Sequence, residues 1–201
     1  IFLYCIFSLW AYSKHMKKSF LLGNLQVSFL TALSVFNVAL FDLIPNGINK
    51  NNGELIIFKI ILCYTAFAFI TTFVREIIKD AEDIEGDKKI KAKTLAITCG
   101  IKKTKWIALI FTMLTFLGIA YFQYFQYSVI TSQFEYEISM WGINSIAILY
   151  ILLLQILLLF LGVKIYYSQV KTDFYFISQL YKFIMIVGIL SIPLFTYLHL
   201  N

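Results

Sequence analysis

The residues best suited to chemistry lie in the segment 75–89, which holds six of the chain's eleven carboxylates. If the apolar helix that enters from residue 55 continues through this segment, Glu76, Asp80, Asp83 and Asp87 fall at i, i+4, i+7 and i+11, which a single helical face can carry. Like charges at this spacing destabilise a helix, so the stripe predicts a neutralising cation. Carboxylate oxygens suit Mg²⁺, which keeps several waters and takes one or two carboxylates together with substrate phosphates.

A simpler alternative is a solvated helix end, in which the acids pair with Lys79, Lys88 and Lys89. The segment follows directly on an apolar run long enough to cross a membrane. Ionisable groups at such a position are expensive to hold and usually functional. This position favours the metal site.

Composition places the chain in a membrane. Of its 201 residues, 60% are hydrophobic and 18% aromatic, and the mean hydropathy is +0.80. These values exclude a soluble domain, and no alternating ten-residue segments of a β-barrel are visible. We therefore predict an all-α, polytopic transmembrane helix bundle. The net charge of +6 fits membrane topology and anionic lipid or phosphate, and we expect no nucleic-acid partner.

The apolar runs predict a partial helix and five full crossings. The partial helix ends at Tyr12, and a mixed segment, 168–182, is expected to form an interfacial helix or loop. A lysine-rich loop is predicted from Asp87 to Lys105. The crossings are expected at 20–43, 55–78, 106–127, 143–166 and 183–198.

The distribution of lysine predicts the orientation. The connections 13–19, 76–105 and 164–173 carry nearly all the lysines, whereas 44–54 holds one and 128–140 none. Because cytoplasmic loops are enriched in Lys and Arg, the acidic segment should face the cytoplasm of a multi-pass cell-membrane protein.

Acidic residues next to lysines at the end of a membrane helix predict a diphosphate-binding site. The acids would hold metal, and Lys88, Lys89 and Lys93 would bind the remaining phosphate oxygens. With an apolar cavity below, the natural substrate has a phosphorylated head and a hydrocarbon tail. When diphosphate leaves an allylic carbon, catalysis consists mainly of neutralising the leaving group and shielding the cation from water.

The run 80–87, followed by Lys93-Thr94-Leu95, resembles the second aspartate-rich motif of the UbiA superfamily of intramembrane prenyltransferases. In that family a D-x-x-x-D pair binds Mg²⁺ and prenyl diphosphate. The resemblance implies that Asp83 and Asp87 are the catalytic, metal-binding pair, and that Asp80 is an additional metal-binding acid found in one branch.

Further substrate contacts are implied by the same resemblance. The turn 12–18 resembles the family's Tyr…Lys-Arg segment, which implies that Tyr12 and Lys17 contact substrate. Asn24 matches the Gly-Asn pair that often follows this turn. Together with Lys88 and Lys93, these are the predicted substrate-binding residues.

The resemblance covers residues 1–201 as a single transmembrane prenyltransferase domain, helices four (partial) to nine of a nine-helix fold. The family's first motif, N-x-x-x-D-x-x-x-D, does not occur in this sequence. The expectation is therefore a fragment that lacks the N-terminal helices and that motif, and whose activity alone is in doubt.

The amino-acid sequence of residues 75–80, before the aspartate motif, is most similar to that of the geranylgeranylglycerol-phosphate geranylgeranyltransferases. This branch of the family prenylates a lipid acceptor. The aromatic acceptors dihydroxynaphthoate, used in menaquinone synthesis, and 4-hydroxybenzoate remain alternatives.

Two other protein classes are less consistent with the sequence. The CDP-alcohol phosphotransferases need D-G-x-x-A-R upstream of their aspartates, and the only arginine here is Arg75. A membrane transporter would be expected to carry charge or broken helices near mid-membrane, whereas these runs keep their acids at the ends.

Overall fold

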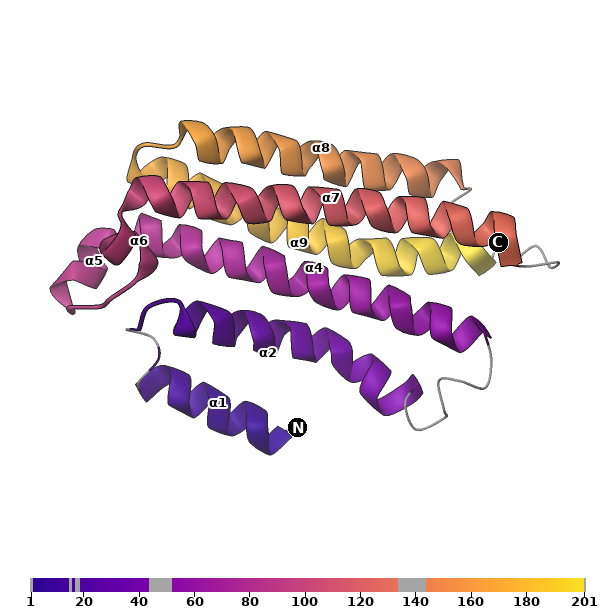
Figure 1. Ribbon diagram of the computed structural model, residues 1–201, viewed down its shortest axis with the longest axis horizontal. Helices are drawn as coiled ribbons and strands as arrows, with labels where there is room; N and C mark the ends of the chain where they lie inside the picture. Colours follow the sequence, from indigo (N-terminus) through magenta and orange to yellow (C-terminus); the bar gives the residue numbers. More distant parts are fainter. Residues whose placement is uncertain (1, 15, 17–18, 44–51, 134–143, 201) are drawn as a thin grey trace. The chain divides into compact units, whose positions relative to one another are not determined.

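The computed structural model describes residues 2–14, 16, 19–43, 52–133 and 144–200, and their secondary structure is helical without strands. The predicted all-α fold is therefore confirmed for these residues (Figure 1). The helices are α1 (Phe2–Lys14), α2 (Leu22–Val38), the π-helical continuation η2 (Ala39–Leu43), α4 (Asn52–Glu82), α5 (Ile84–Lys89), α6 (Leu95–Cys99), α7 (Ile101–Gln133), α8 (Ser145–Tyr167) and α9 (Lys171–Leu200).

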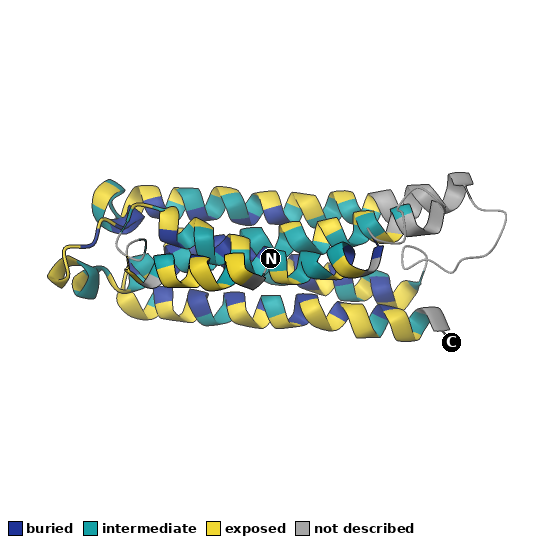
Figure 2. Ribbon diagram, turned by 90° about the horizontal axis from the view of Figure 1, so that it is seen from below, coloured by how far each residue is buried: buried dark blue, intermediate teal, exposed yellow. Residues whose placement is uncertain are grey.

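Five of the described helices are long and apolar enough to cross a membrane, which agrees with the predicted polytopic bundle. Many of their large apolar side chains are exposed, as the yellow stripes along the helices show in Figure 2. Exposed hydrocarbon on this scale is stable only in lipid. The candidate spans are Leu22–Phe41, Ile57–Glu82, Ile101–Tyr124, Ser145–Tyr167 and Lys171–Leu198.

The chain divides into two compact units, Ile1–Ala108 and Leu109–Asn201. In the first unit, α2 packs along α4, α1 packs on α2, and α6 packs on α4. The Gln26 amide of α2 donates to the backbone oxygen and the hydroxyl of Ser8 in α1. A polar group in an apolar medium needs such a partner, so this contact fixes the pairing of α1 with α2.

The polar side chains of α2 were expected to face other helices or a cavity. This is correct for Gln26 and for Asn24, which reaches α4. Ser28 and Thr31 instead bond to backbone oxygens one turn earlier in their own helix, and Ser34 is exposed while bonding to Thr31 O. Short hydroxyl side chains can donate to a backbone oxygen one turn earlier in their own helix, so they need no partner on another helix.

Gly23 marks a close approach between the start of α2 and the segment before it. A Cβ at this position would lie 2.9 Å from the Met16 backbone oxygen and 3.3 Å from Cε2 of Tyr12. The absence of a side chain therefore lets the Tyr12 ring pack directly on the α2 backbone.

In the second unit, α8 packs against α9. Phe195 is buried in a small apolar cluster with Ala147 and Ile151, and the Tyr150 hydroxyl donates to Val187 O at 2.6 Å. Tyr181 of α9 is buried, and its hydroxyl lies 2.5 Å from that of Thr112 in α7. Buried phenols need such partners, so these bonds specify how the three helices of this unit meet.

Two sequence expectations are wrong. The last helix does not begin near 183, because it is continuous from Lys171, and Asp173 Oδ2 caps its start by accepting from the Gln169 and Val170 amides at 2.8 and 3.1 Å. The lysine-rich segment 87–105 is not a loop throughout, since it contains parts of α5 and α7 and all of α6. Lysine is a good helix former, so a polar, lysine-rich sequence can form a solvent-exposed helix as well as a loop. Most of the connections 44–54 and 128–140 lies outside the described residues.

We predict that Gly23→Ala destabilises the protein by about 1–3 kcal/mol, because the new methyl group meets backbone that cannot move aside. The measurement is the thermal unfolding midpoint in detergent. Gly118→Ala is the matched control, since no atom lies within 4 Å of a Cβ at that helical position, and its midpoint should stay the same or rise. Equal midpoints for the two variants would contradict the close approach.

Candidate active site at the end of α4

The acidic residues are positioned by a buried stripe on α4. Val74, Ile77, Ile78 and Ala81 repeat at i, i+3, i+4 and i+7 and are almost fully buried. This stripe fixes the rotation of the helix, so Glu76 and Asp80 are partly buried on a different face. Burial of the apolar residues thereby determines where the acids lie.

The helix does not continue unbroken through the acidic segment, which corrects the sequence expectation. α4 ends at Glu82 and α5 begins at Ile84, with Asp83 between them at φ −105° and ψ 24°. The backbone bonds from Asp83 N to Lys79 O (3.0 Å) and from Asp87 N to Asp83 O (2.9 Å) persist on both sides. The break is therefore limited to one residue, Asp83.

A tight turn ends α5. Lys91 adopts a left-handed conformation with φ 53°, and Ala92 N donates to Asp87 O at 3.0 Å. Bonds of this kind satisfy the last carbonyls of a helix. The chain then enters α6, whose Leu95 is buried and which packs on α4 and α5. Burial of this short apolar helix holds the acidic end of the segment close to α4.

Asp80 is tied to α2. The Asn24 side-chain amide donates to Asp80 Oδ2 at 2.7 Å, and Ser28 Oγ donates to Asn24 O at 2.6 Å. The Tyr12 side chain is half-buried and lies within electrostatic range of Glu76 and Asp80. Asn24, Tyr12 and Asp80, predicted separately from the sequence, are therefore brought together. The structure shows Asn24 bonded to the acid itself.

The other predicted site residues differ in exposure. Asp87 is partly buried and within electrostatic range of Asp80, whereas Asp83 is exposed. Lys88 and Lys93 are exposed as well. The predicted contact Lys17 lies outside the described residues.

Gly86 leaves room for the Asp83 carboxylate. Oδ1 of Asp83 lies 2.7 Å from the place that a Cβ of Gly86 would occupy, so the carboxylate rests against the bare backbone of α5. Within the described residues, no group of three or more acids, histidines or cysteines is close enough together to hold a metal ion. Asp83 and Asp87 nevertheless fit Mg²⁺ in type and number, because Mg²⁺ commonly takes one or two carboxylates and completes its shell with water and phosphate.

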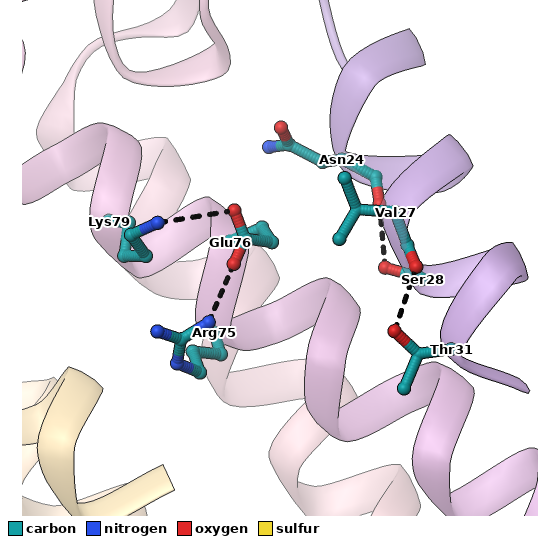
Figure 3. Close-up of polar contacts among 7 residues, drawn as sticks. All are labelled: Asn24, Val27, Ser28, Thr31, Arg75, Glu76 and Lys79. Carbon is teal, nitrogen blue, oxygen red and sulfur yellow. Dashed lines mark hydrogen bonds and ion pairs between the residues drawn. The ribbon is translucent and has the colours of Figure 1, made fainter. Parts of the chain in front are cut away.

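The sequence predicts a charged cluster on α4 only in part, because the solvated-helix alternative pairs the acids with Lys79 but gives Arg75 no role. Arg75 Nη1 contacts Glu76 Oε1 at 2.7 Å, and Lys79 Nζ lies 3.6 Å from Glu76 Oε2 (Figure 3). The sequence offered one signal, a lone arginine at i−4 from a lysine within a membrane helix, where charge is costly. Glu76, expected to belong to the acidic stripe, is instead neutralised by these two cations.

Helices that are long and apolar enough to cross a membrane, with acids and lysines at the end of one of them, place the chain in the class of polytopic integral membrane proteins. The family model for the UbiA prenyltransferase family matches residues 1–199. The chain therefore belongs to the UbiA prenyltransferase family, and the resemblance seen in its motifs is confirmed.

Curated relatives agree with this assignment. The chain is 40% identical to the digeranylgeranylglyceryl phosphate synthase of Methanosphaera stadtmanae over 55% of its own length and 36% of that protein. It is 39% identical to the synthase of the same name from Saccharolobus solfataricus over 51% of the chain and 33% of that protein. For the one from Sulfurisphaera tokodaii the identity is 32%, over 79% of the chain and 48% of that protein. The chain thus spans less than half the length of these relatives. No solved structure matches it significantly.

We predict that Asn24→Ala destabilises the first unit by about 1.5–3 kcal/mol, the scale of a hydrogen bond to a charged group, because it leaves the Asp80 carboxylate without its donor. The thermal unfolding midpoint in detergent measures the effect. Asn37→Ala on the same helix is the control, since Asn37 Oδ1 is buried without a partner among the described residues and its loss should cost less. A larger effect of Asn37→Ala would contradict the role of the Asn24 bond.

Proposed function

We propose that the complete protein transfers a geranylgeranyl group from its diphosphate to the hydroxyl of geranylgeranylglycerol phosphate in the membrane. The observation that carries this proposal is the acidic end of α4 and α5, with Asp83 and Asp87 four residues apart, in a chain of the UbiA prenyltransferase family. The acceptor is supported by the relatives, which are named digeranylgeranylglyceryl phosphate synthases. Dihydroxynaphthoate and 4-hydroxybenzoate are the alternative acceptors.

In the proposed reaction the bond between C1 of the prenyl chain and the diphosphate oxygen breaks. The acceptor oxygen forms an ether bond to C1 and loses its proton. Asp83 and Asp87, with Asp80 as an additional acid, would hold Mg²⁺, which when bound neutralises the negative charge of the leaving group. Asp83 rests on Gly86, so its carboxylate is held by the backbone of α5, the helix that also carries Asp87.

The other predicted contacts would bind and orient the diphosphate. Lys88 and Lys93 are exposed beside the acids, where their ammonium groups can reach phosphate oxygens, and Lys17 would add a third cation. Asn24 would act through Asp80, holding that carboxylate in place. Tyr12, packed on Gly23 and facing the same acids, would close the other side of the site.

The proposed orientation places this site at the cytoplasmic face of the cell membrane. Its support is the concentration of lysine in the connections 13–19, 76–105 and 164–173. A water-soluble diphosphate head could then approach from the cytoplasm while both hydrocarbon chains remain in the bilayer.

We predict that Asp83→Ala and Asp87→Ala each lower turnover at least about a hundredfold, because each removes a charge that the diphosphate site needs. Asp80→Ala should be milder. Prenyl transfer is measured in membranes that contain the complete protein, with and without Mg²⁺. Glu85→Ala, which removes an exposed acid of α5 between the two aspartates, should retain wild-type turnover. Wild-type rates in excess EDTA would refute the metal site.

The acceptor is tested in the same membranes with geranylgeranyl diphosphate as donor. We expect transfer to geranylgeranylglycerol phosphate to exceed transfer to dihydroxynaphthoate or 4-hydroxybenzoate, because the relatives' names point to a glycerol phosphate lipid. The products are separated and quantified by mass spectrometry. Prenylation of dihydroxynaphthoate alone would replace the lipid assignment with a role in quinone synthesis and leave the metal site unaffected.

A further inference from the structure

A second polar face runs along the end of α4. Thr72, Arg75 and Lys79 are spaced i, i+3 and i+7, so they lie on one face of this helix. Glu76 and Asp80 are each one residue further along and lie about 100° around the helix axis. The end of α4 therefore has a cationic face next to its acidic one.

The arginine of this face is more deeply buried than its lysine. Arg75 and Lys79 share one carboxylate, Glu76, and bind its two oxygens separately, as Figure 3 shows. Only 17% of the Arg75 side chain is exposed, compared with 47% for Lys79. Lys79 also lies within electrostatic range of Asp80. The group that is costly to hold here is therefore the largely buried Arg75 guanidinium, which has five N–H donors to satisfy.

Two hydrogen-bonding groups on this face also have no partner among the described residues. Thr72 Oγ1 is buried, with its residue 4% exposed, and Arg75 Nε is buried as well. The neighbouring Thr71 bonds to Phe67 O at 2.6 Å, which is the usual arrangement for threonine in a membrane helix, whereas Thr72 does not. Unpaired polar groups are expensive, so two of them one turn apart indicate a position for a ligand.

We propose that Thr72, Arg75 and Lys79 form a binding site for the phosphate of the lipid acceptor. This inference rests on the proposed function and assigns its acceptor subsite. A phosphate monoester offers three terminal oxygens, and the face offers three donors: the threonine hydroxyl, the guanidinium edge with Nε, and the lysine ammonium. A planar carboxylate, as on the aromatic acceptors, has only two oxygens and would leave one donor unpaired.

The position of this site explains how one helix end could hold two anionic substrates. The donor diphosphate needs Mg²⁺ and therefore the acids, whereas the acceptor phosphate would bind directly to cations on the neighbouring face. Glu76 lies between the two faces and holds both cations in place. The acceptor's phosphate is thus kept away from the carboxylates, which would repel it.

The test is the Michaelis constant of each substrate for Arg75→Gln and Lys79→Gln, measured in membranes with geranylgeranyl diphosphate and geranylgeranylglycerol phosphate. We expect the KM for the acceptor to rise about tenfold to a hundredfold in each variant, the scale of a lost charged hydrogen bond, while the KM for the donor changes less than about twofold. Arg75→Lys should recover part of the loss, because it restores the charge without the planar donors. Lys102→Gln, which removes an exposed lysine at the start of α7, should leave both constants unchanged.

The outcomes separate the two hypotheses. If the wild-type protein turns over only an acceptor that lacks phosphate, the proposed function and this subsite are both wrong. If the wild type uses the phosphate lipid but the acceptor constant stays within about twofold in the variants, only the subsite is wrong. An equal rise in the donor constant would also overturn it, because the face would then belong to the diphosphate site. Should Arg75→Gln fail to accumulate, Lys79→Gln decides, since Lys79 is half exposed and its loss should spare folding.

Discussion

The structure depends on one constraint, which is that charged groups at the end of a membrane helix must be paired. α4 brings Arg75, Glu76, Lys79 and Asp80 to its end within two turns, and each makes a specific contact. The contact of Asp80 is with α2, so a charge that would destabilise an isolated helix becomes the point where two helices are joined. The same bond fixes the position of an acid that we propose for metal binding.

The helical class and the five membrane crossings could be predicted because they follow from composition and from the length of each apolar segment. A bilayer of fixed thickness requires a helix of about 20 apolar residues. The extent of α9 could not, because its first turns are polar enough to resemble a loop and their helical state depends on the Asp173 cap. The break at Asp83 was also missed. A periodic pattern tests whether residues can share a face, and it is insensitive to a single residue that redirects the chain while keeping its hydrogen bonds.

Within the candidate site, the sequence indicates which residues could act but not which partners they contact. Asp80 and Asn24 are both predicted site residues. The hydrogen bond between them joins residues 56 positions apart, so no local sequence pattern indicates it. The pairing of Lys79 with Glu76 follows from i,i+3 spacing and belongs to the solvated-helix alternative. The pairing of Arg75 with Glu76 joins adjacent residues and has no such signal. The close approaches at Gly23 and Gly86 depend on what surrounds each glycine, which only the fold supplies.

The backbone bonds of the acidic turn have an evolutionary consequence. Asp83 and Asp87 hold α5 through main-chain atoms, Asp83 by its amide and carbonyl and Asp87 by its amide to Asp83 and its carbonyl to Ala92. Any residue except proline can supply these bonds. A paralogue that lost both carboxylates would keep the same turn and the same buried helices while losing the metal ligands that we propose. In this family, the fold alone would therefore not distinguish an active member from an inactive one. The residues at the two aspartate positions would have to be identified from the sequence.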